Sequence, residues 1–332
     1  MTTETGARVR PAALVPGDLV AFVAPSRPVE PEAINFAARL LEGWGLRTTT
    51  RWLVPGGRGY LAGESDRARA RAIEEALADP DVAMAWCARG GYGAGRLLPL
   101  IDWDRLRGTG RPVALVGYSD VTALHLAIAR ELGWTTFHGP VAALVKADGP
   151  GVTTGGLHRA LTGVEAPGRL PVPGEADGWA PLVRVVRPGR ATGPLTGGNL
   201  ALVASLVGTP WAMRGKGCLV VLEDVGEAPY RVDRLLTQLR QSGALDGCVG
   251  IAFGSSPTCE RAPDDRPSLD LLSVLDDLLG DLGVPVTYGW PIGHTAHQWT
   301  LPFGARATME ARSGDFAEAW LSIDETGMEA AR

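Results

Sequence analysis

Cysteine is scarce in this 332-residue chain, and the few cysteines form no motif. Cys87, Cys218, Cys248 and Cys259 are scattered without a Cys-x-x-Cys pair, and three of them lie in or beside apolar runs typical of strands. This pattern argues against a structural zinc site and favours buried, reduced thiols in a cytoplasmic protein.

Long apolar runs and blocks of basic charge are also missing. No stretch approaches the roughly 20 apolar residues that span a bilayer. The first 16 residues contain Arg8 and Arg10 but neither the apolar segment nor the cleavage site of a signal peptide. The formal net charge is −5, and no cluster of Lys and Arg stands out to neutralise phosphates. We therefore expect no secretion signal, no membrane association and no nucleic-acid partner.

The first half of the chain alternates short apolar runs with amphipathic helical patterns. Residues 18–23, 46–50, 82–88 and 112–116 are typical of strands, and residues 31–44 and 65–79 of helices. This alternation predicts parallel pairing in a Rossmann-like or flavodoxin-like α/β layer. The length predicts about two domains. A stretch rich in Gly and Pro suggests that they are residues 1–150 and 191–332, with a linker at 151–190.

The run of β-forming residues at 112–116 leads directly into Ser119, and a helical pattern follows it. Open α/β sheets hold their ligands at the carboxyl ends of their strands, so Ser119 stands where a nucleophile could act. The N–H groups of the next helix could receive negative charge there. Alternatively, Ser119 or Asp120 simply caps the helix, and these residues alone favour the cap.

Residues 89–96 form a turn with four glycines directly after the strand at 82–88. The turn lacks G-K-[ST] of a P-loop and the last glycine of G-x-G-x-x-G, which argues against a nucleotide phosphate loop. Two interpretations are equally good. The glycines serve only a tight turn, or an N–H of Gly90 or Gly91 forms half of an oxyanion hole.

In the second half, Glu223, Asp224 and His294 follow apolar runs typical of strands. Glu223 and Asp224 could equally be solvated loop acids. His294 and His297 suggest a metal, but no Cys or carboxylate cluster completes a site, so we predict none. His125 and His138 are better explained as structural residues. The runs at 306–311 and 319–323 predict closing antiparallel strands.

Ser119, Glu223 and His294 supply the nucleophile, acid and base of a hydrolytic triad, which may occur in any sequence order. Spacing alone leaves this triad as one possibility among several. The G-x-S-x-G elbow of α/β-hydrolases is absent, because Val121 occupies the place of the second glycine.

Several motifs, in order along nearly the whole chain, resemble the serine LD-carboxypeptidases, which include muramoyltetrapeptide carboxypeptidases and microcin-C immunity-type peptidases. They are Val-Ala-Pro-Ser (23–26), Cys-Ala-Arg-Gly-Gly-Tyr-Gly (87–93), Gly-Tyr-Ser-Asp-Val-Thr-Ala-Leu-His (117–125), Thr-Phe-His-Gly-Pro (136–140), Gly-Gly-Asn-Leu (197–200), Leu-Glu-Asp-Val-Gly-Glu (222–227), Tyr-Arg-Val-Asp-Arg (230–234), Gly-His (293–294) and Leu-Pro (301–302).

The resemblance implies a flavodoxin-like N-terminal domain with the nucleophile and a smaller β-rich C-terminal domain with the acid and base. By analogy, Ser119 is the nucleophile, His294 the general base and Glu223 the residue that orients it. The N–H of Asp120 and one from Gly90-Gly91 would form the oxyanion hole. No metal or cofactor is required, and homodimers are common in the family.

A carboxypeptidase must also bind the free carboxylate of its substrate. We expect Arg89 or Arg231 to do so, Arg89 preferably because it adjoins the glycine turn, with Tyr92 also contacting substrate. The expected activity is removal of the terminal D-alanine from murein tetrapeptides during cell-wall peptide recycling. The alternatives are an immunity-type peptidase that cleaves peptidyl-nucleotide antibiotics and a non-catalytic ligand-binding protein, with a nucleotide-dependent oxidoreductase more distant.

Overall fold

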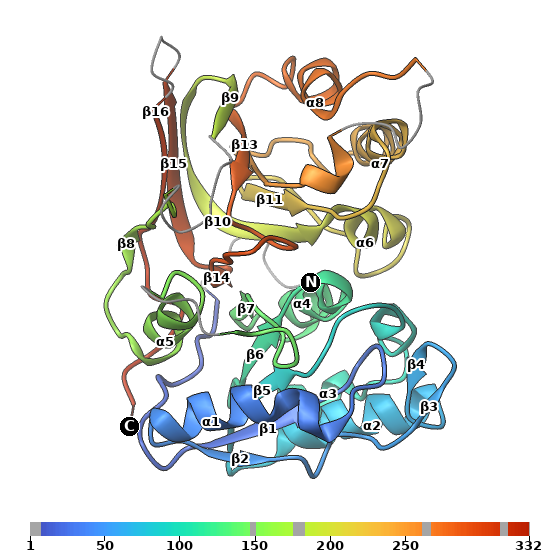
Figure 1. The fold of residues 1–332 in the computed structure, drawn as a ribbon, viewed down its shortest axis with the longest axis vertical. Coiled ribbons are helices and arrows are strands. Elements are labelled where there is room, and N and C mark those ends of the chain that lie inside the picture. The colour runs from blue at the N-terminus through green and yellow to red at the C-terminus, as the bar shows by residue number, and fades with distance from the viewer. Residues whose placement is uncertain (1–7, 147–150, 175–182, 261–266, 313–317, 332) are drawn as a thin grey trace. The chain divides into compact units, whose positions relative to one another are not determined.

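The computed structural model describes residues 8–146, 151–174, 183–260, 267–312 and 318–331, and it divides into two compact units. The first unit comprises Met1–Ala166, Thr300–Ala305 and Thr326–Arg332, and the second comprises Pro167–Trp299 and Arg306–Glu325. Each unit is built on its own large sheet (Figure 1).

The first unit contains a six-stranded sheet in the order β14-β7-β6-β5-β1-β2, in which every pairing is parallel except that of β14 with β7. Its strands are β1 (Leu19–Val23), β2 (Arg47–Thr49), β5 (Val82–Cys87), β6 (Ala114–Gly117), β7 (Thr136–His138) and β14 (Leu301–Phe303). Apart from β14 and the small hairpin of β3 (Gly57–Arg58) and β4 (Leu61–Ala62), this order is that of flavodoxin. The predicted flavodoxin-like sheet is therefore confirmed.

The central strands β1, β5 and β6 are apolar and almost wholly buried, as in a parallel sheet covered by helices, whereas β2 at the edge is polar and partly exposed. Phe22 of β1 stacks on Trp86 of β5 with their ring centroids 6.0 Å apart, in a core that also contains Leu41 and Leu161. The helices of the unit are η1 (Pro31–Ile34), α1 (Asn35–Gly43), α2 (Asp66–Ala78), η2 (Ala94–Arg96), α3 (Trp103–Gly108), η3 (Ser119–Val121), α4 (Thr122–Glu131) and α5 (Thr154–Thr162).

The second unit is the predicted β-rich one, with an eight-stranded sheet in the order β8-β16-β15-β10-β11-β12-β13-β9. Its strands are β8 (Gly168–Arg169), β9 (Arg184–Arg187), β10 (Gly189–Asn199), β11 (Leu219–Glu223), β12 (Gly250–Gly254), β13 (Val286–Trp290), β15 (Arg306–Arg312) and β16 (Glu318–Ile323). The strands β10 to β13 run parallel, and antiparallel strands flank them on both sides. The carboxyl ends of β11 and β13 therefore lie at the same edge.

The helices of the second unit are α6 (Leu200–Ser205), α7 (Pro229–Gln241), η5 (Pro257–Cys259) and α8 (Leu271–Leu279). The apolar segment after Asn199 is a helix, capped by the Asn199 side chain, which accepts a hydrogen bond from the Leu202 N–H. The leucine-rich helix α8 is capped by Asp270, whose side chain accepts a hydrogen bond from the Ser273 N–H.

The first unit runs to Ala166 and the second begins at Pro167, whereas the expected boundaries are at 150 and 190. Helix α5 belongs to the first unit, whereas β8 and β9 belong to the second. Strand β14 returns to the first unit from the C-terminal region, because Leu301–Phe303 pairs with Thr136–His138. Residues 175–182 of the expected linker lie outside the described residues.

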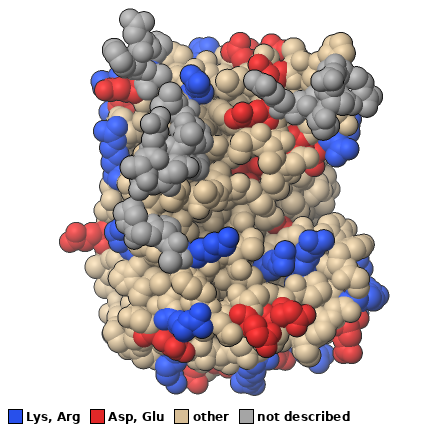
Figure 2. Space-filling view, in the orientation of Figure 1, with Lys and Arg blue, Asp and Glu red and all other residues tan. Residues whose placement is uncertain are grey.

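The described helices include none that is long and apolar enough to cross a membrane. On the face drawn in Figure 2, the acidic and basic side chains that the structure describes are interspersed, without a broad field of one sign. Recognition of a charged ligand on that face would therefore depend on individual side chains.

Candidate active site

Ser119 lies in the predicted turn between a strand and a helix, and its backbone is strained. It follows β6, precedes α4, and is the one non-glycine residue with a positive φ (+63°) in the described part of the chain. Such a conformation costs about 1–3 kcal/mol and persists only where surrounding contacts enforce it. The strained backbone holds the side chain of Ser119, which is half-buried, at the carboxyl end of the sheet.

The helix-cap interpretation of this turn is wrong. Neither Ser119 nor Asp120 caps the helix, because the cap positions of η3 and α4 carry no side-chain hydrogen bond. The Asp120 carboxylate is instead buried, and its Oδ2 accepts hydrogen bonds from Ser26 Oγ (2.6 Å) and Ala94 N (2.8 Å). Ser119 is thus left without a capping role.

The glycine turn after β5 lies against Ser119. A Cβ on Gly90 would be 2.9 Å from the Ser119 Cβ, which no real Cβ contact allows. Gly91 has φ +121°, and a Cβ there would meet the Arg27 side chain at 2.4 Å. The close approach of the turn to Ser119 therefore requires glycine at position 90, and the packing of the Arg27 side chain requires glycine at position 91. That their N–H groups form an oxyanion hole stays a prediction.

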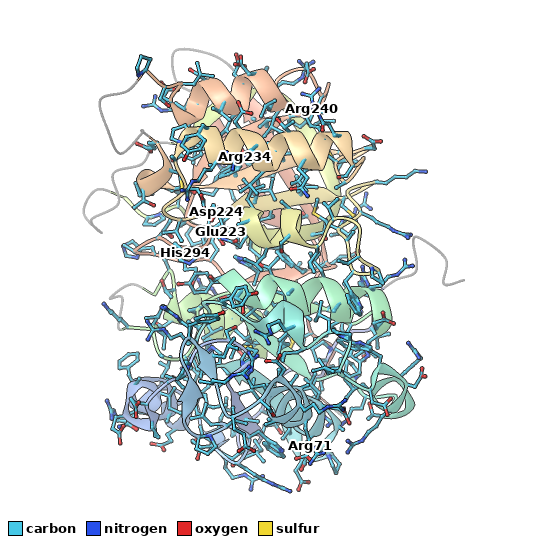
Figure 3. The ribbon with its side chains drawn as sticks, turned by 90° about the vertical axis from the view of Figure 1, so that its right-hand side faces the viewer. Arg71, Glu223, Asp224, Arg234, Arg240 and His294 are labelled. Carbon is cyan, nitrogen blue, oxygen red and sulfur yellow. The ribbon has the colours of Figure 1, made fainter. Side chains whose placement is uncertain are left out.

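Glu223 and His294 meet in the second unit, as Figure 3 shows. Glu223 ends β11 and is fully buried, and His294 follows β13 at the same edge of the sheet. His294 Nδ1 lies 2.8 Å from Glu223 Oε2, and the His294 backbone N–H donates to the same oxygen at 3.3 Å. This contact fixes the imidazole ring and leaves Nε2 as the nitrogen that can accept a proton.

The surroundings of His294 favour its protonation more than water does for an ordinary histidine. Burial disfavours the imidazolium, but the hydrogen bond and charge of Glu223, together with the charge of Asp224, raise the pKa of His294 above its ordinary value. Glu223 Oε1 is buried without a hydrogen-bond partner among the described residues. The two contacts with His294 therefore partly offset the cost of burying this carboxylate.

Asp224 supports the site from a buried position. Its carboxylate accepts hydrogen bonds from Asn199 Nδ2 (3.1 Å), Ala201 N (2.9 Å) and Val225 N (2.8 Å). Burial, with a contribution from the charge of Glu223, raises the pKa of Asp224 to about 6. The alternative that Glu223 and Asp224 are solvated loop acids is wrong, because both are buried.

His125 and His138 make contacts typical of structural residues. His125 Nε2 lies 2.9 Å from the Gly117 carbonyl oxygen, and the His138 ring stacks on Phe303. Both are buried. Among the described residues, no group of three or more His, Cys, Asp and Glu side chains is arranged to hold a metal ion.

The residues predicted to bind substrate lie on both units. Arg89 and Tyr92 of the first unit are exposed. In the second unit Arg231 is also exposed, but its guanidinium contacts Glu227 (3.5 Å) and the Tyr230 hydroxyl (3.1 Å). Their roles toward substrate stay predictions.

The sequence interpretation assigned no role to Ser26, Arg69 or Tyr60. The exposed Tyr60 ring packs edge to face on Tyr92 with centroids 5.4 Å apart. Arg69 is buried and donates to the Pro25 carbonyl. The burial of Arg69 could have been inferred from the sequence, because Arg69 falls on the same helical face as the buried Ile73 and Ala76.

Family models cover most of the chain. Residues 20–139 match the LD-carboxypeptidase N-terminal domain, and residues 192–309 match the LD-carboxypeptidase C-terminal domain. The chain belongs to the LD-carboxypeptidase family. The resemblance seen in the motifs is thus confirmed, and the protein is a hydrolase of the carboxypeptidase class.

Relatives of this LD-carboxypeptidase match along nearly their full lengths. It is 35% identical over 302 residues to a Bacillus subtilis protein named a probable murein peptide carboxypeptidase (90% of this chain, 91% of that protein). It is 32% identical over 301 residues to the murein tetrapeptide carboxypeptidase of Pseudomonas aeruginosa (88% and 92%).

Solved structures agree on the fold. The muramoyltetrapeptide carboxypeptidase from Oxalobacter formigenes superposes with a TM-score of 0.75 at 28% identity, covering 95% of this LD-carboxypeptidase and 100% of that chain. MccF in complex with glutamyl sulfamoyl guanosine superposes with a TM-score of 0.81 at 23% identity, covering 96% and 99%, and this likeness shows the fold alone.

Proposed function

We propose that the protein is a serine LD-carboxypeptidase that releases the terminal D-alanine of murein tetrapeptides. The observation that carries this proposal is the buried Glu223 carboxylate bonded to Nδ1 of His294, which prepares a base, together with a serine held in a strained turn. The names of the relatives support the substrate. We further propose that the enzyme acts in the cytoplasm as a homodimer in cell-wall peptide recycling.

In the proposed reaction, Glu223 holds the tautomer in which His294 Nδ1–H donates to it and Nε2 carries no proton. Nε2 takes the proton of Ser119 Oγ as the oxygen attacks the carbonyl carbon of the scissile amide. The N–H groups of Asp120 and of Gly90 or Gly91 stabilise the resulting oxyanion. His294 then protonates the leaving amine of D-alanine, and a water molecule hydrolyses the Ser119 ester in the same way.

The experiment is to measure D-alanine release from a diaminopimelate-containing tetrapeptide by wild type, Ser119→Ala and the control Ser205→Ala. Ser205 is exposed at the end of α6, and its hydroxyl donates a hydrogen bond to the local Leu202 carbonyl. We expect release by wild type and control, none by Ser119→Ala, and no effect of chelators. Absence of release by the wild type contradicts the proposal.

One alternative has specific support, because the fold is also that of MccF, whose structure was solved in complex with glutamyl sulfamoyl guanosine. An immunity-type peptidase would cleave an aminoacyl sulfamoyl adenosine in a Ser119-dependent manner and would release no D-alanine. A non-catalytic ligand-binding protein would cleave neither compound and would leave Ser119 unlabelled by a fluorophosphonate.

A further inference from the structure

The side chain of Asp120 connects three segments that are far apart in the sequence. It directly follows Ser119, and its Oδ2 accepts one hydrogen bond from Ser26, beyond the end of β1, and one from the N–H of Ala94 in the glycine turn. Both bonds are buried, and Asp120 is 1% exposed. Hydrogen bonds to an ionised acceptor are roughly twice as strong as neutral ones.

A buried cation completes this arrangement. Arg69 donates to the Pro25 carbonyl at 2.5 Å and forms an ion pair with Asp66. A Cβ on Gly93 would lie 2.6 Å from Arg69 Nη1, so the guanidinium packs directly beneath the glycine turn. Arg69 therefore packs against the turn at Gly93, and Asp120 accepts a hydrogen bond from the turn at Ala94.

We propose that the Asp120 carboxylate is a positioning group that fixes the turn of residues 89–94 on Ser119. This inference rests on the proposed function, in which the turn supplies an oxyanion donor. The strained φ of Ser119 and the contact of Gly90 with the Ser119 side chain both require the turn and the nucleophile to keep one relative position. The bonds of Asp120 supply that constraint, because they join the residue after the nucleophile to the residue that ends the turn.

The test compares Asp120→Asn, Asp120→Ala and Ser26→Ala with the control Asp104→Asn, which makes the same chemical change on an exposed carboxylate of α3. D-Alanine release gives kcat and KM, and labelling by a fluorophosphonate gives the reactivity of Ser119. Amide hydrogen exchange of residues 88–96 reports the order of the turn. Thermal unfolding verifies that each variant is folded.

We expect Asp120→Asn to lower kcat about 10- to 100-fold with KM changed less than about threefold, since loss of one oxyanion donor costs about 100- to 1000-fold. Ser26→Ala removes one of the two bonds and should have a smaller effect in the same direction. Exchange at residues 88–96 should accelerate in both variants. Asp120→Ala should show the largest changes in kcat and exchange, and the control should match the wild type.

The proposal is overturned if folded Asp120→Asn and Ser26→Ala retain the kcat and the exchange rates of the wild type. It is also overturned if Asp120→Ala lowers only the unfolding temperature. If the wild type releases no D-alanine, the proposed function fails, but fluorophosphonate labelling and hydrogen exchange still decide the role of Asp120. Slower labelling with faster exchange supports that role, and unchanged values refute it.

Discussion

A Cβ atom at position 293 would lie 2.1 Å from Oε2 of Glu223, the oxygen that His294 contacts. Gly293 also has φ +81°, which disfavours any side chain. His294 can therefore reach the Glu223 carboxylate only because the preceding residue has no Cβ. Glycine at this position is a requirement of the Glu223–His294 contact as well as of the turn.

Gly293→Ala should therefore abolish activity by displacing Glu223 or His294. We expect kcat/KM to fall at least about 100-fold, since a misplacement of about 1 Å near the reacting groups can cost this much. The matched control is Gly283→Ala, because Gly283 has a similar φ of +76° with no atom near its would-be Cβ. Both variants should lose stability from backbone strain, but only Gly293→Ala should lose activity. Equal activity in the two variants would contradict the argument.

Glu223→Gln should change the pH profile of the enzyme. The charge and hydrogen bond of Glu223 raise the pKa of His294 against the effect of burial, so loss of the charge lowers that pKa. His294 must be neutral to act as base, and activity therefore rises as pH rises through its pKa. The acidic limb of kcat/KM should move to lower pH, while the plateau falls roughly 100- to 10,000-fold.

The control for this profile is Glu310→Gln, because Glu310 in β15 pairs with Arg190 and Arg312 rather than with His294. Its acidic limb should coincide with that of the wild type. An acidic limb that stays in place in Glu223→Gln would show that the limb does not report His294.

His125 should make folding sensitive to acid. Burial lowers the pKa of His125 to about 4 from its ordinary 6.5, against the opposite effect of the Gly117 carbonyl. The unfolded chain therefore takes up a proton below pH 6.5 that the folded chain refuses until about pH 4. This contribution is fully present above pH 6.5 and is lost as pH falls to 4, by roughly 3 kcal/mol in all.

Urea unfolding of wild type and His125→Gln between pH 4 and 7 measures this effect. The difference in unfolding free energy between the two proteins isolates His125 from other groups, such as Asp224, that titrate in the same range. We expect the wild type to lose more stability than the variant as pH falls. Parallel curves would mean that His125 keeps an ordinary pKa in the folded state.

The strand ends that carry the candidate site could be predicted from sequence, whereas the contacts that brace them could not. Ser119, Glu223 and His294 each follow a short apolar run, and this local pattern is sufficient to place a polar side chain at a sheet edge. The contact of Ser26 with Asp120 joins residues 94 positions apart. No periodicity reports such a pairing, nor does any predict the positive φ of Ser119.

The extent of the two compact units depends on contacts that the sequence does not report. A stretch rich in Gly and Pro marks irregular backbone, which is why we expect the linker at 151–190. The return of residues 300–305 to the first unit depends instead on the pairing of β14 with β7, in which Leu301 lies opposite His138. The short apolar run at Leu301–Phe303 carries no sign of which sheet it joins, because an edge strand of three residues fits either sheet.

Arg89 and Arg231 are the two candidates for binding the substrate carboxylate, and their surroundings differ. The Arg231 guanidinium already contacts Glu227 and Tyr230, whereas no ion pair of Arg89 is found in the described part of the chain. Arg89 also adjoins Gly90, which lies against Ser119. We therefore expect Arg89→Ala to raise KM about 10- to 100-fold, as loss of a charged hydrogen bond of about 1.5–3 kcal/mol implies, and Arg231→Ala to have a smaller effect.

A substrate change makes this prediction specific. A tetrapeptide with a C-terminal carboxamide lacks the charge that Arg89 would bind, so the wild type should cleave it with a KM raised by a similar factor. Arg89→Ala should treat the acid and the amide alike, whereas Arg51→Ala, a change at an exposed arginine that pairs with Asp79, should discriminate like the wild type. If Arg89→Ala still prefers the acid as strongly as the wild type does, another group binds the carboxylate, and Arg231→Ala tested with the same two peptides decides whether it is Arg231.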